Sequence, residues 1–215
     1  MTKFETVPCP IVQNMYFIGR NYVEHIEELG NDRPSEPLIF CKPLSCMVQS
    51  GTGIPYPEHS KSLHFEGEMV FRLPTEGGFS ENNQTMLVGC GLDLTARDVQ
   101  SKLKEKGWPW FSAKCFRGSA VLSGMFVAVP FNKLTHLSIE TWVNGTRRQH
   151  GLYTQKLFPL HALVEHLSEL VDIGDSDFLF TGTPAGVGEV FPGDRIEARL
   201  LLDNKVQVKA ECEVI

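Results

Sequence analysis

The chain has 215 residues, of which 42% are hydrophobic and 21% charged, so it holds enough apolar material for the core of a globular domain. The formal net charge is -6 and no block of like charges stands out, which argues against nucleic-acid binding, because phosphate contacts need clustered Lys and Arg. No apolar run reaches the length of a membrane span and the first residues lack the apolar stretch of a signal peptide. We therefore expect one domain over residues 1–215, in the cytoplasm, with no membrane partner.

Three short helices are expected in chain order. The first covers about residues 22–29 and is closed by Gly30. The second begins at Thr95, because Thr95 and Asp98 resemble a capping box. The third lies behind a proline and carries apolar side chains at helical spacing: Leu160, Leu163, Val164, Leu167, Leu170 and Val171.

Most of the other segments are expected to be strands. Asn144-Gly145, between residues 138–143 and 146–150, is a strong hairpin signal. A second hairpin is expected around Asp203-Asn204, and further strands at 63–71, 86–92 and 178–181. Strands and helices do not alternate, so the pattern predicts an α+β fold, mainly β, rather than a doubly wound parallel sheet.

The six cysteines contain no Cys-x-x-Cys pair, which argues against a structural zinc site. The chain is long and rich in apolar residues, so it does not need a disulfide framework. We interpret the cysteines as reduced thiols that pack as small hydrophobic side chains.

Two glutamates near residue 67 are the first candidates for chemistry. Side chains two apart share one face of a strand, so Glu66 and Glu68 should point the same way, as should His64. Adjacent carboxylates repel unless a cation or a proton lies between them. Oxygen ligands of this kind suit Mg²⁺, Mn²⁺ or Ca²⁺ better than zinc. The alternative is a solvated strand face, which is equally compatible with this segment alone.

A third ligand is available at Asp93, which lies in an apolar stretch before the second helix. A carboxylate in such surroundings is costly unless it is paired or bound to a cation. A turn or capping role is the alternative for Asp93. Asp98 is the weaker candidate ligand, because helix capping already explains it.

His25 and Glu28 are three residues apart, so on a helix they share one face. A carboxylate that orients a histidine suits it to act as the base that activates a water molecule. An exposed polar helix face is the alternative.

Residues 181–188 form a glycine-rich turn that can bring backbone N–H groups close to an anion, although it lacks the P-loop ending and a plain structural turn also explains it.

Together these motifs resemble the fumarylacetoacetate hydrolase family, and within it the short acylpyruvate hydrolase and oxaloacetate decarboxylase-like members. The matching landmarks run from residue 19 to residue 188: Gly19-Arg20-Asn21-Tyr22, Lys42-Pro43, Phe65-Glu66-Gly67-Glu68, Leu92-Asp93-Leu94-Thr95-Ala96-Arg97-Asp98, Ala113-Lys114 and Thr181-Gly182-Thr183-Pro184. One departure is Phe65, where acylpyruvase-type relatives often carry a histidine. This position should face away from Glu66 in a strand, so we expect packing rather than chemistry to differ.

The resemblance implies a rolled, mixed β-sheet with a few short helices, a homodimer, and Mg²⁺ as the usual metal. It also assigns roles to nine residues: metal ligands Glu66, Glu68 and Asp93, catalytic residues His25, Glu28 and Lys114, and substrate contacts Arg20, Gln100 and Thr183. Residues 19–30, bounded by glycines, are a segment that can move as a lid.

A small 2-oxo acid is the substrate that this resemblance implies. The metal would act as a Lewis acid and stabilise the enolate that forms when the adjacent C–C bond breaks. We favour C–C hydrolysis of an acylpyruvate, a 2,4-dioxo acid. Oxaloacetate decarboxylation, and isomerisation or hydration of a 2-oxo acid, remain open on the same site. A catalytically inert metal-binding module is the alternative of another class, although an intact His25, Glu28 and Lys114 argue against it.

Overall fold

The structure is a computed structural model that describes residues 4–28, 32–73 and 85–215. Strands dominate it and form three hydrogen-bonded sheets. The nine strands of the first sheet are β1 (Thr6–Pro8), β2 (Asn14–Gly19), β3 (Leu38–Lys42), β4 (Met47–Gln49), β7 (Gly67–Arg72), β8 (Thr85–Asp93), β10 (Ala120–Leu122), β11 (Met125–Pro130) and β14 (Asp177–Phe180). Their main order is β1-β11-β8-β7-β14-β2-β3, and β10 pairs with both β4 and β8.

The second sheet has five strands in the order β13-β12-β16-β17-β5. They are β5 (Thr52–Ile54), β12 (Leu137–Val143), β13 (Thr146–Leu152), β16 (Arg195–Leu202) and β17 (Lys205–Val214). A third, small sheet contains β6 (Leu63–Phe65), β9 (Thr95–Ala96) and β15 (Gly188–Val190). Parallel pairs such as β14 with β2 occur beside antiparallel pairs such as β14 with β7, so the sheets are mixed.

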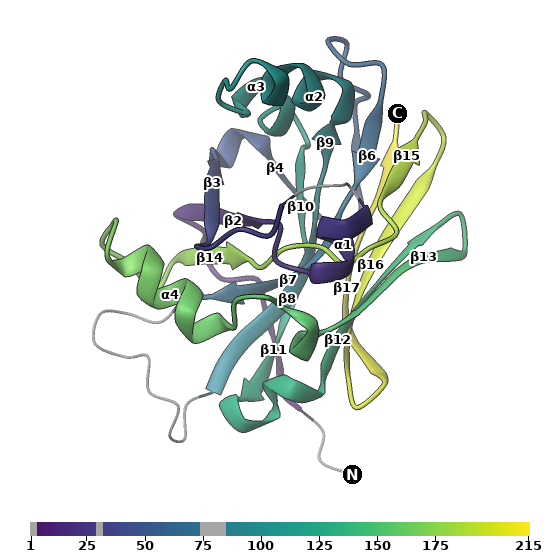
Figure 1. Cartoon of the computed structure of the whole chain (residues 1–215). Coiled ribbons are helices and arrows are strands. Elements are labelled where there is room, and N and C mark those ends of the chain that lie inside the picture. The colour runs from purple at the N-terminus through teal and green to yellow at the C-terminus, as the bar shows by residue number, and fades with distance from the viewer. Residues whose placement is uncertain (1–3, 29–31, 74–84) are drawn as a thin grey trace.

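The helices are few and short. They are α1 (Val23–Glu28), α2 (Arg97–Glu105), α3 (Phe111–Lys114) and α4 (Leu160–Ser168), with 3₁₀ turns η1 (Leu44–Cys46), η2 (Phe131–His136) and η3 (Tyr153–Gln155). Figure 1 shows α2 and α3 together at one end of the sheets and α4 on another side. The expected α+β fold, mainly β, is confirmed. Within the described ranges, no helix has the length and apolar character that crossing a bilayer requires.

Both predicted hairpins are present. Asn144 and Gly145 join β12 to β13 with φ values of 50° and 76°. Asp203 and Asn204 join β16 to β17 with φ values of 50° and 60°. A two-residue turn with both φ angles positive matches the right-handed twist of the flanking strands, and Asn, Asp and Gly tolerate it best.

The main core lies between the two larger sheets. Side chains that alternate along each strand from both sheets join one apolar cluster, and the buried face of α4 packs into it. The opposite face of the nine-stranded sheet carries a smaller aromatic cluster that includes Phe17, Phe178 and Phe180. Apolar side chains therefore cover the nine-stranded sheet on both faces and hold its strands rigidly, which fixes the positions of polar residues at strand ends.

Two predicted helix boundaries are wrong. Helix α2 begins at Arg97 rather than Thr95, because Thr95 and Ala96 pair with β6 as a strand. No side chain caps this helix, and Asp98 instead accepts a hydrogen bond of 2.6 Å from the Ser60 hydroxyl. Helix α4 ends at Ser168, so the predicted apolar face is shorter than expected. Leu170 and Val171 lie beyond it and are 63% and 40% exposed.

Other expectations hold within the described residues. Helix α1 covers most of the first predicted helix, whereas Leu29 and Gly30 lie outside the described residues. All six cysteines are free thiols, as the absence of paired spacing predicts. Phe65 is buried in the main core, as expected of a packing residue.

The predicted strand 63–71 is interrupted at Glu66. Strand β6 pairs with β9 and β15 in the small sheet, whereas β7 pairs with β8 and β14 in the large one. The chain therefore passes from one sheet to the other at this glutamate. The interruption places a carboxylate where the small sheet, the large sheet and α2 meet.

Candidate metal and substrate site

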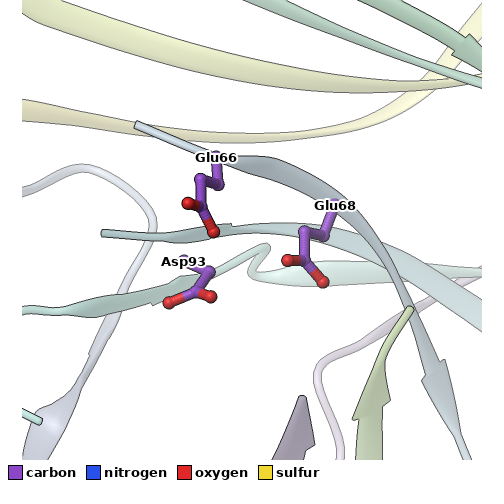
Figure 2. A group of neighbouring side chains, drawn as sticks. All are labelled: Glu66, Glu68 and Asp93. Carbon is purple, nitrogen blue, oxygen red and sulfur yellow. The ribbon is translucent and has the colours of Figure 1, made fainter. Parts of the chain in front are cut away.

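Three buried carboxylates meet at the junction of β7 and β8. The antiparallel register pairs Gly67 with Leu92, and the Asp93 amide donates to the Glu66 carbonyl at 2.8 Å, so these two acidic residues lie opposite each other. Glu68 lies two residues further along β7 on the same face. Each carboxylate offers an oxygen within 4.8 Å of the others, and the three side chains point toward one space (Figure 2). The alternation argument for this pair is confirmed, and a solvated strand face is excluded because all three are buried.

Two lysines hold the Asp93 carboxylate. Lys114, the last residue of α3, lies 2.6 Å from Asp93 Oδ2 and 2.8 Å from Glu66 Oε2, and it donates to the Thr95 hydroxyl at 2.7 Å. Lys42, the last residue of β3, lies 2.6 Å from Asp93 Oδ1 and donates to two backbone carbonyls. The cost of burying Asp93 is thus offset by paired cations, as its apolar sequence context requires.

The surroundings favour the charged forms of Glu66 and Lys114, whereas they oppose the charged form of Lys42. Burial opposes ionisation of Glu66, yet Lys114 and Arg97 hold its pKa well below the usual range. Burial also opposes charge on Lys114, but Asp93 and Glu66 raise its pKa, so this ammonium stays protonated. Burial lowers the pKa of Lys42, against the opposing influence of Asp93.

Glu68 differs from the other two carboxylates. Its Oε2 accepts a hydrogen bond of 2.8 Å from the Gly182 amide, and within the described part of the chain it has no ion-pair partner. Burial, with the charges of Asp93 and Glu66, raises the pKa of Glu68 well above its usual range. A third buried carboxylate without a counter-charge fits a divalent cation, which would supply that charge. The cluster can therefore hold a divalent metal ion.

The raised pKa gives a first prediction. The Glu68 carboxyl binds its proton more tightly in the folded chain than in the unfolded chain, because its pKa is raised on folding. The metal-free fold therefore loses stability as pH rises from the usual carboxyl range through the raised pKa. We expect Glu68→Gln to remove this loss, so metal-free denaturant midpoints at pH 4.5 and 7.5 should differ less than in wild type. Mg²⁺ at a hundred times its Kd should stabilise wild type by about 2.7 kcal/mol and the variant much less.

Glu213→Gln, an exposed site on β17, is the matched control and should retain both behaviours of the wild type. A Glu68→Gln variant that Mg²⁺ stabilises as much as it stabilises wild type would show that Glu68 is not a ligand.

Helix α1 places His25 and Glu28 as expected. His25 Nδ1 lies 3.2 Å from Glu28 Oε2, and Glu28 Oε1 accepts a hydrogen bond of 3.0 Å from the Gly186 amide. His25 is 6% exposed, and burial lowers the pKa of its imidazole although Glu66 and Glu28 oppose the shift. His25 is therefore buried and neutral near pH 7, so the alternative of an exposed polar helix face is excluded for His25, whereas Glu28 is exposed.

The backbone of the glycine-rich turn at 181–188 donates hydrogen bonds to two carboxylate side chains of the protein. The Gly182 amide donates to Glu68 and the Gly186 amide to Glu28. Gly182 has a φ of 89°, and a Cβ there would come within 2.8 Å of the Asn21 side chain, so the close approach requires glycine. This turn thus joins the carboxylate cluster to the histidine pair.

The same pocket contains all three expected substrate contacts. Arg20, Gln100 and Thr183 line it with the carboxylates, His25 and Lys114. The Thr183 hydroxyl donates to the Gly67 carbonyl at 3.0 Å and accepts from Gln149 at 2.7 Å, which fixes its orientation. Gln100 Oε1 accepts a hydrogen bond of 2.6 Å from Arg97. Eight of the nine residues assigned by the resemblance therefore line one pocket, and the ninth, Glu28, contacts it through His25.

Four further residues of the site were not predicted. Arg97 binds Glu66, Lys42 binds Asp93, and Lys104 and Trp110 line the pocket. Lys42 ends an apolar run as Asp93 does, so the same burial argument would have found it. Arg97 belongs to one of the family landmarks and lies three residues before Gln100 on a helix, but neither signal assigned it a role in the site.

Residues 14–213 match the family described as fumarylacetoacetate (FAA) hydrolase C-terminal, and the chain belongs to this family. It is 33% identical to an oxaloacetate tautomerase, mitochondrial, of Rattus norvegicus, covering 94% of this chain and 92% of the relative. It is 36% identical to an oxaloacetate decarboxylase, mitochondrial, of Dictyostelium discoideum, covering 88% and 90%. The fumarylpyruvate hydrolase of Pseudomonas aeruginosa, solved with Mn²⁺ and pyruvate, aligns with a TM-score of 0.77 at 31% identity over 95% of this chain and 90% of that one.

Proposed function

We propose that this protein is a Mg²⁺-dependent enzyme that enolises a small 2-oxo acid, with Glu66, Glu68 and Asp93 as metal ligands. The observation that carries the proposal is the convergence of three buried carboxylates, one of them without a counter-charge, with a neutral buried histidine and a charged lysine in one pocket. Relatives named for oxaloacetate and fumarylpyruvate support the substrate class, because both compounds are 2-oxo acids. Mn²⁺ in one relative supports a divalent ion, and Mg²⁺ is our proposal for this chain.

The bound metal would supply Lewis acidity to the carboxylate and keto oxygens of the substrate. Lys114 is held close to the carboxylates and stays charged, so its ammonium can stabilise negative charge that develops on the keto oxygen. Arg97 contacts both Glu66 and Gln100 and so fixes the two side chains relative to each other. These residues would orient a 2-oxo acid in the pocket.

His25 is the residue we propose as the base. Its imidazole is neutral near pH 7, so it can take a proton either from the carbon next to the keto group or from a water molecule. Glu28 orients it, and the contact of Glu28 with Gly186 holds α1 against the glycine-rich turn. Asn21 and Tyr22 hold the start of the same segment through hydrogen bonds with Thr181 and Lys156, so an opening confined to α1 would break the Glu28–Gly186 contact.

Isomerisation of an oxaloacetate-like acid is the reaction we place first, because relatives of that name share a third of their residues with nearly the whole chain. Hydrolysis of an acylpyruvate, which the sequence favoured, is the second candidate. The specific support for hydrolysis is the orientation of His25 by Glu28, since an oriented base is what an attacking water needs. An inert metal-binding module would need neither that pair nor a charged Lys114.

Hydrogen exchange on pyruvate tests the proposed function independently of the final reaction. In D₂O, an enolising enzyme should exchange the methyl protons of pyruvate for deuterium, which proton NMR follows directly. We expect exchange with Mg²⁺ and little above the buffer rate after EDTA treatment. If the Mg²⁺-loaded protein leaves the methyl signal unchanged, and also leaves oxaloacetate and acetylpyruvate unchanged, the proposed function is wrong.

The oligomeric state and the cellular location of the protein are the last parts of the proposal. We propose a homodimer in the cytoplasm; several relatives are named mitochondrial, so they do not support the cytoplasm. Sedimentation equilibrium at micromolar concentration should give twice the chain mass of 24.1 kDa. A single species at the chain mass would refute the dimer.

A further inference from the structure

Lys104 is a cation of the pocket that none of the proposed steps uses. It lies on α2, and its spacing of four residues from Gln100 and seven from Arg97 places all three on one face of the helix. All three line the pocket that contains the carboxylate cluster. Helix α2 therefore presents a polar stripe to the pocket, and Lys104 is the member of that stripe furthest along the helix from Arg97.

The charge on Lys104 is not balanced by the protein. In the described residues no carboxylate lies within ion-pair distance of its ammonium, whereas Lys114 has two such partners. Its Nζ lies 5.4 Å from the centroid of the Trp110 ring, a contact that directs a half-buried side chain without neutralising it. Burial, followed by the charges of Arg20 and Arg97, lowers the pKa of Lys104 to about 8, although Glu66 opposes the shift.

Arg20 adds a second unbalanced cation. Its backbone has a φ of 57°, a left-handed conformation that a long side chain rarely adopts. Its Nε is buried and has no hydrogen-bond partner. Backbone strain combined with an unsatisfied buried donor is typical of a residue held ready for a ligand. Arg20 and Lys104 line one pocket and repel each other, which favours an anion between or beside them.

The carboxylate cluster does not need these two cations. Glu66 is paired with Lys114 and Arg97, and Asp93 with Lys114 and Lys42. The 2-oxo acid group of a substrate would be bound at the metal ligands and Lys114. An anion for Lys104 must therefore come from another part of the substrate.

We propose that Lys104 is a specificity residue that, with Arg20, binds a second carboxylate at the far end of the substrate, so that the site selects dicarboxylic 2-oxo acids over those with a neutral tail. This inference rests on the proposed function and names its substrate class. Oxaloacetate has such a second carboxylate, whereas acetylpyruvate ends in a neutral acetyl group. Selection follows because two half-buried cations would remain without an anion when a neutral tail occupies the pocket.

Two probes that are expected to give no net product separate binding of the far carboxylate from general attraction of anions. Oxalate carries two negative charges on adjacent carbons and mimics only the 2-oxo acid group. 2-Oxoglutarate carries the same total charge but places its second carboxylate at the far end. Affinities of both probes for the Mg²⁺-loaded protein are measured by calorimetry in wild type and in the variants Lys104→Met and Lys104→Arg. Lys102→Met, an exposed lysine on the same helix, is the matched control.

Lys104→Met should weaken 2-oxoglutarate by about 10–100-fold, the usual effect of losing a hydrogen bond to a charged group, and should change oxalate by less than about threefold. Lys104→Arg should recover most of the 2-oxoglutarate affinity because the charge is restored. Lys102→Met should match wild type for both probes. Oxaloacetate and acetylpyruvate serve as the reacting substrates. In Lys104→Met, kcat/KM for oxaloacetate should fall, while kcat/KM for acetylpyruvate should stay at the wild-type value.

Equal losses for both probes would overturn the inference, because they would mean that Lys104 only adds to the overall positive field of the pocket. Unchanged affinity for both would overturn it as well. In either case wild type would still bind oxalate with Mg²⁺, so the proposed function would stand. A wild-type protein that binds neither probe in the presence of Mg²⁺ would remove the proposed function and this inference together.

Discussion

Glu66→Gln is expected to bind Mg²⁺ at least about a hundredfold more weakly than wild type and to lose its activity with the metal. Replacing a residue that only supports a ligand typically costs 10–100-fold in affinity, so replacing a ligand should cost the upper end or more. The amide has the shape of the carboxylate but lacks the charge that a hard divalent cation requires. Mg²⁺ titration by calorimetry and turnover of oxaloacetate measure the two losses.

Glu66→Gln can also destabilise the fold, and this effect must be separated from the loss of Mg²⁺ binding. Glu66 is paired with Lys114 and Arg97, and breaking a buried pair can destabilise a protein by about 3–5 kcal/mol. Glu68→Gln is the matched variant, because it removes a proposed ligand that has no ion pair in the described residues. It should lose Mg²⁺ as well while its metal-free fold melts at or above the wild-type temperature. Full activity of Glu66→Gln in EDTA-treated buffer would mean that the metal assignment is wrong.

His25→Ala should cut enolisation and acylpyruvate hydrolysis by about 10²–10⁴-fold, the typical contribution of a general base. Mg²⁺ affinity should stay near that of wild type, because the three proposed ligands lie on other elements. Decarboxylation of oxaloacetate needs no attacking water, so it should fall less unless His25 also holds α1 closed over the substrate. The pyruvate exchange rate, the two turnover rates and a Mg²⁺ titration measure these effects.

Glu28→Gln should give a milder loss in the same reactions, because the amide keeps a hydrogen bond to His25 but no longer favours its protonated form. His150→Ala, at an exposed position of β13, is the control and should behave as wild type. Small and equal losses in all reactions for His25→Ala would show that this histidine is not the base. The Mg²⁺ site would be unaffected by that result.

The parts of the fold that could be predicted are those set by local backbone chemistry. Asn144-Gly145 and Asp203-Asn204 specify their hairpins because few other residues accept two successive positive φ angles. Alternation along a strand was enough to place Glu66 and Glu68 together. The cost of an unpaired carboxylate was enough to identify Asp93, although its partners Lys42 and Lys114 were not known from that argument.

Pairings between distant segments could not be predicted in this way. The start of α2 was wrong because Thr95 and Ala96 pair with residues more than 30 positions earlier, and this contact competes with the local capping pattern. The break at Glu66 depends on β15, which lies more than 120 residues later. The contact of Glu28 with Gly186 has the same origin, so only the folded chain shows what holds α1 near the carboxylates.

Turnover by metal-stripped wild-type protein tests the central claim most directly. The protein is treated with EDTA, dialysed, and assayed with oxaloacetate and with acetylpyruvate before and after Mg²⁺ is restored, with each non-enzymatic rate subtracted. We predict negligible turnover without the metal and clear turnover of at least one substrate with it, at one Mg²⁺ per chain. Equal turnover with and without Mg²⁺, or no turnover of either substrate by protein that has bound Mg²⁺, would contradict a metal-dependent 2-oxo acid enzyme.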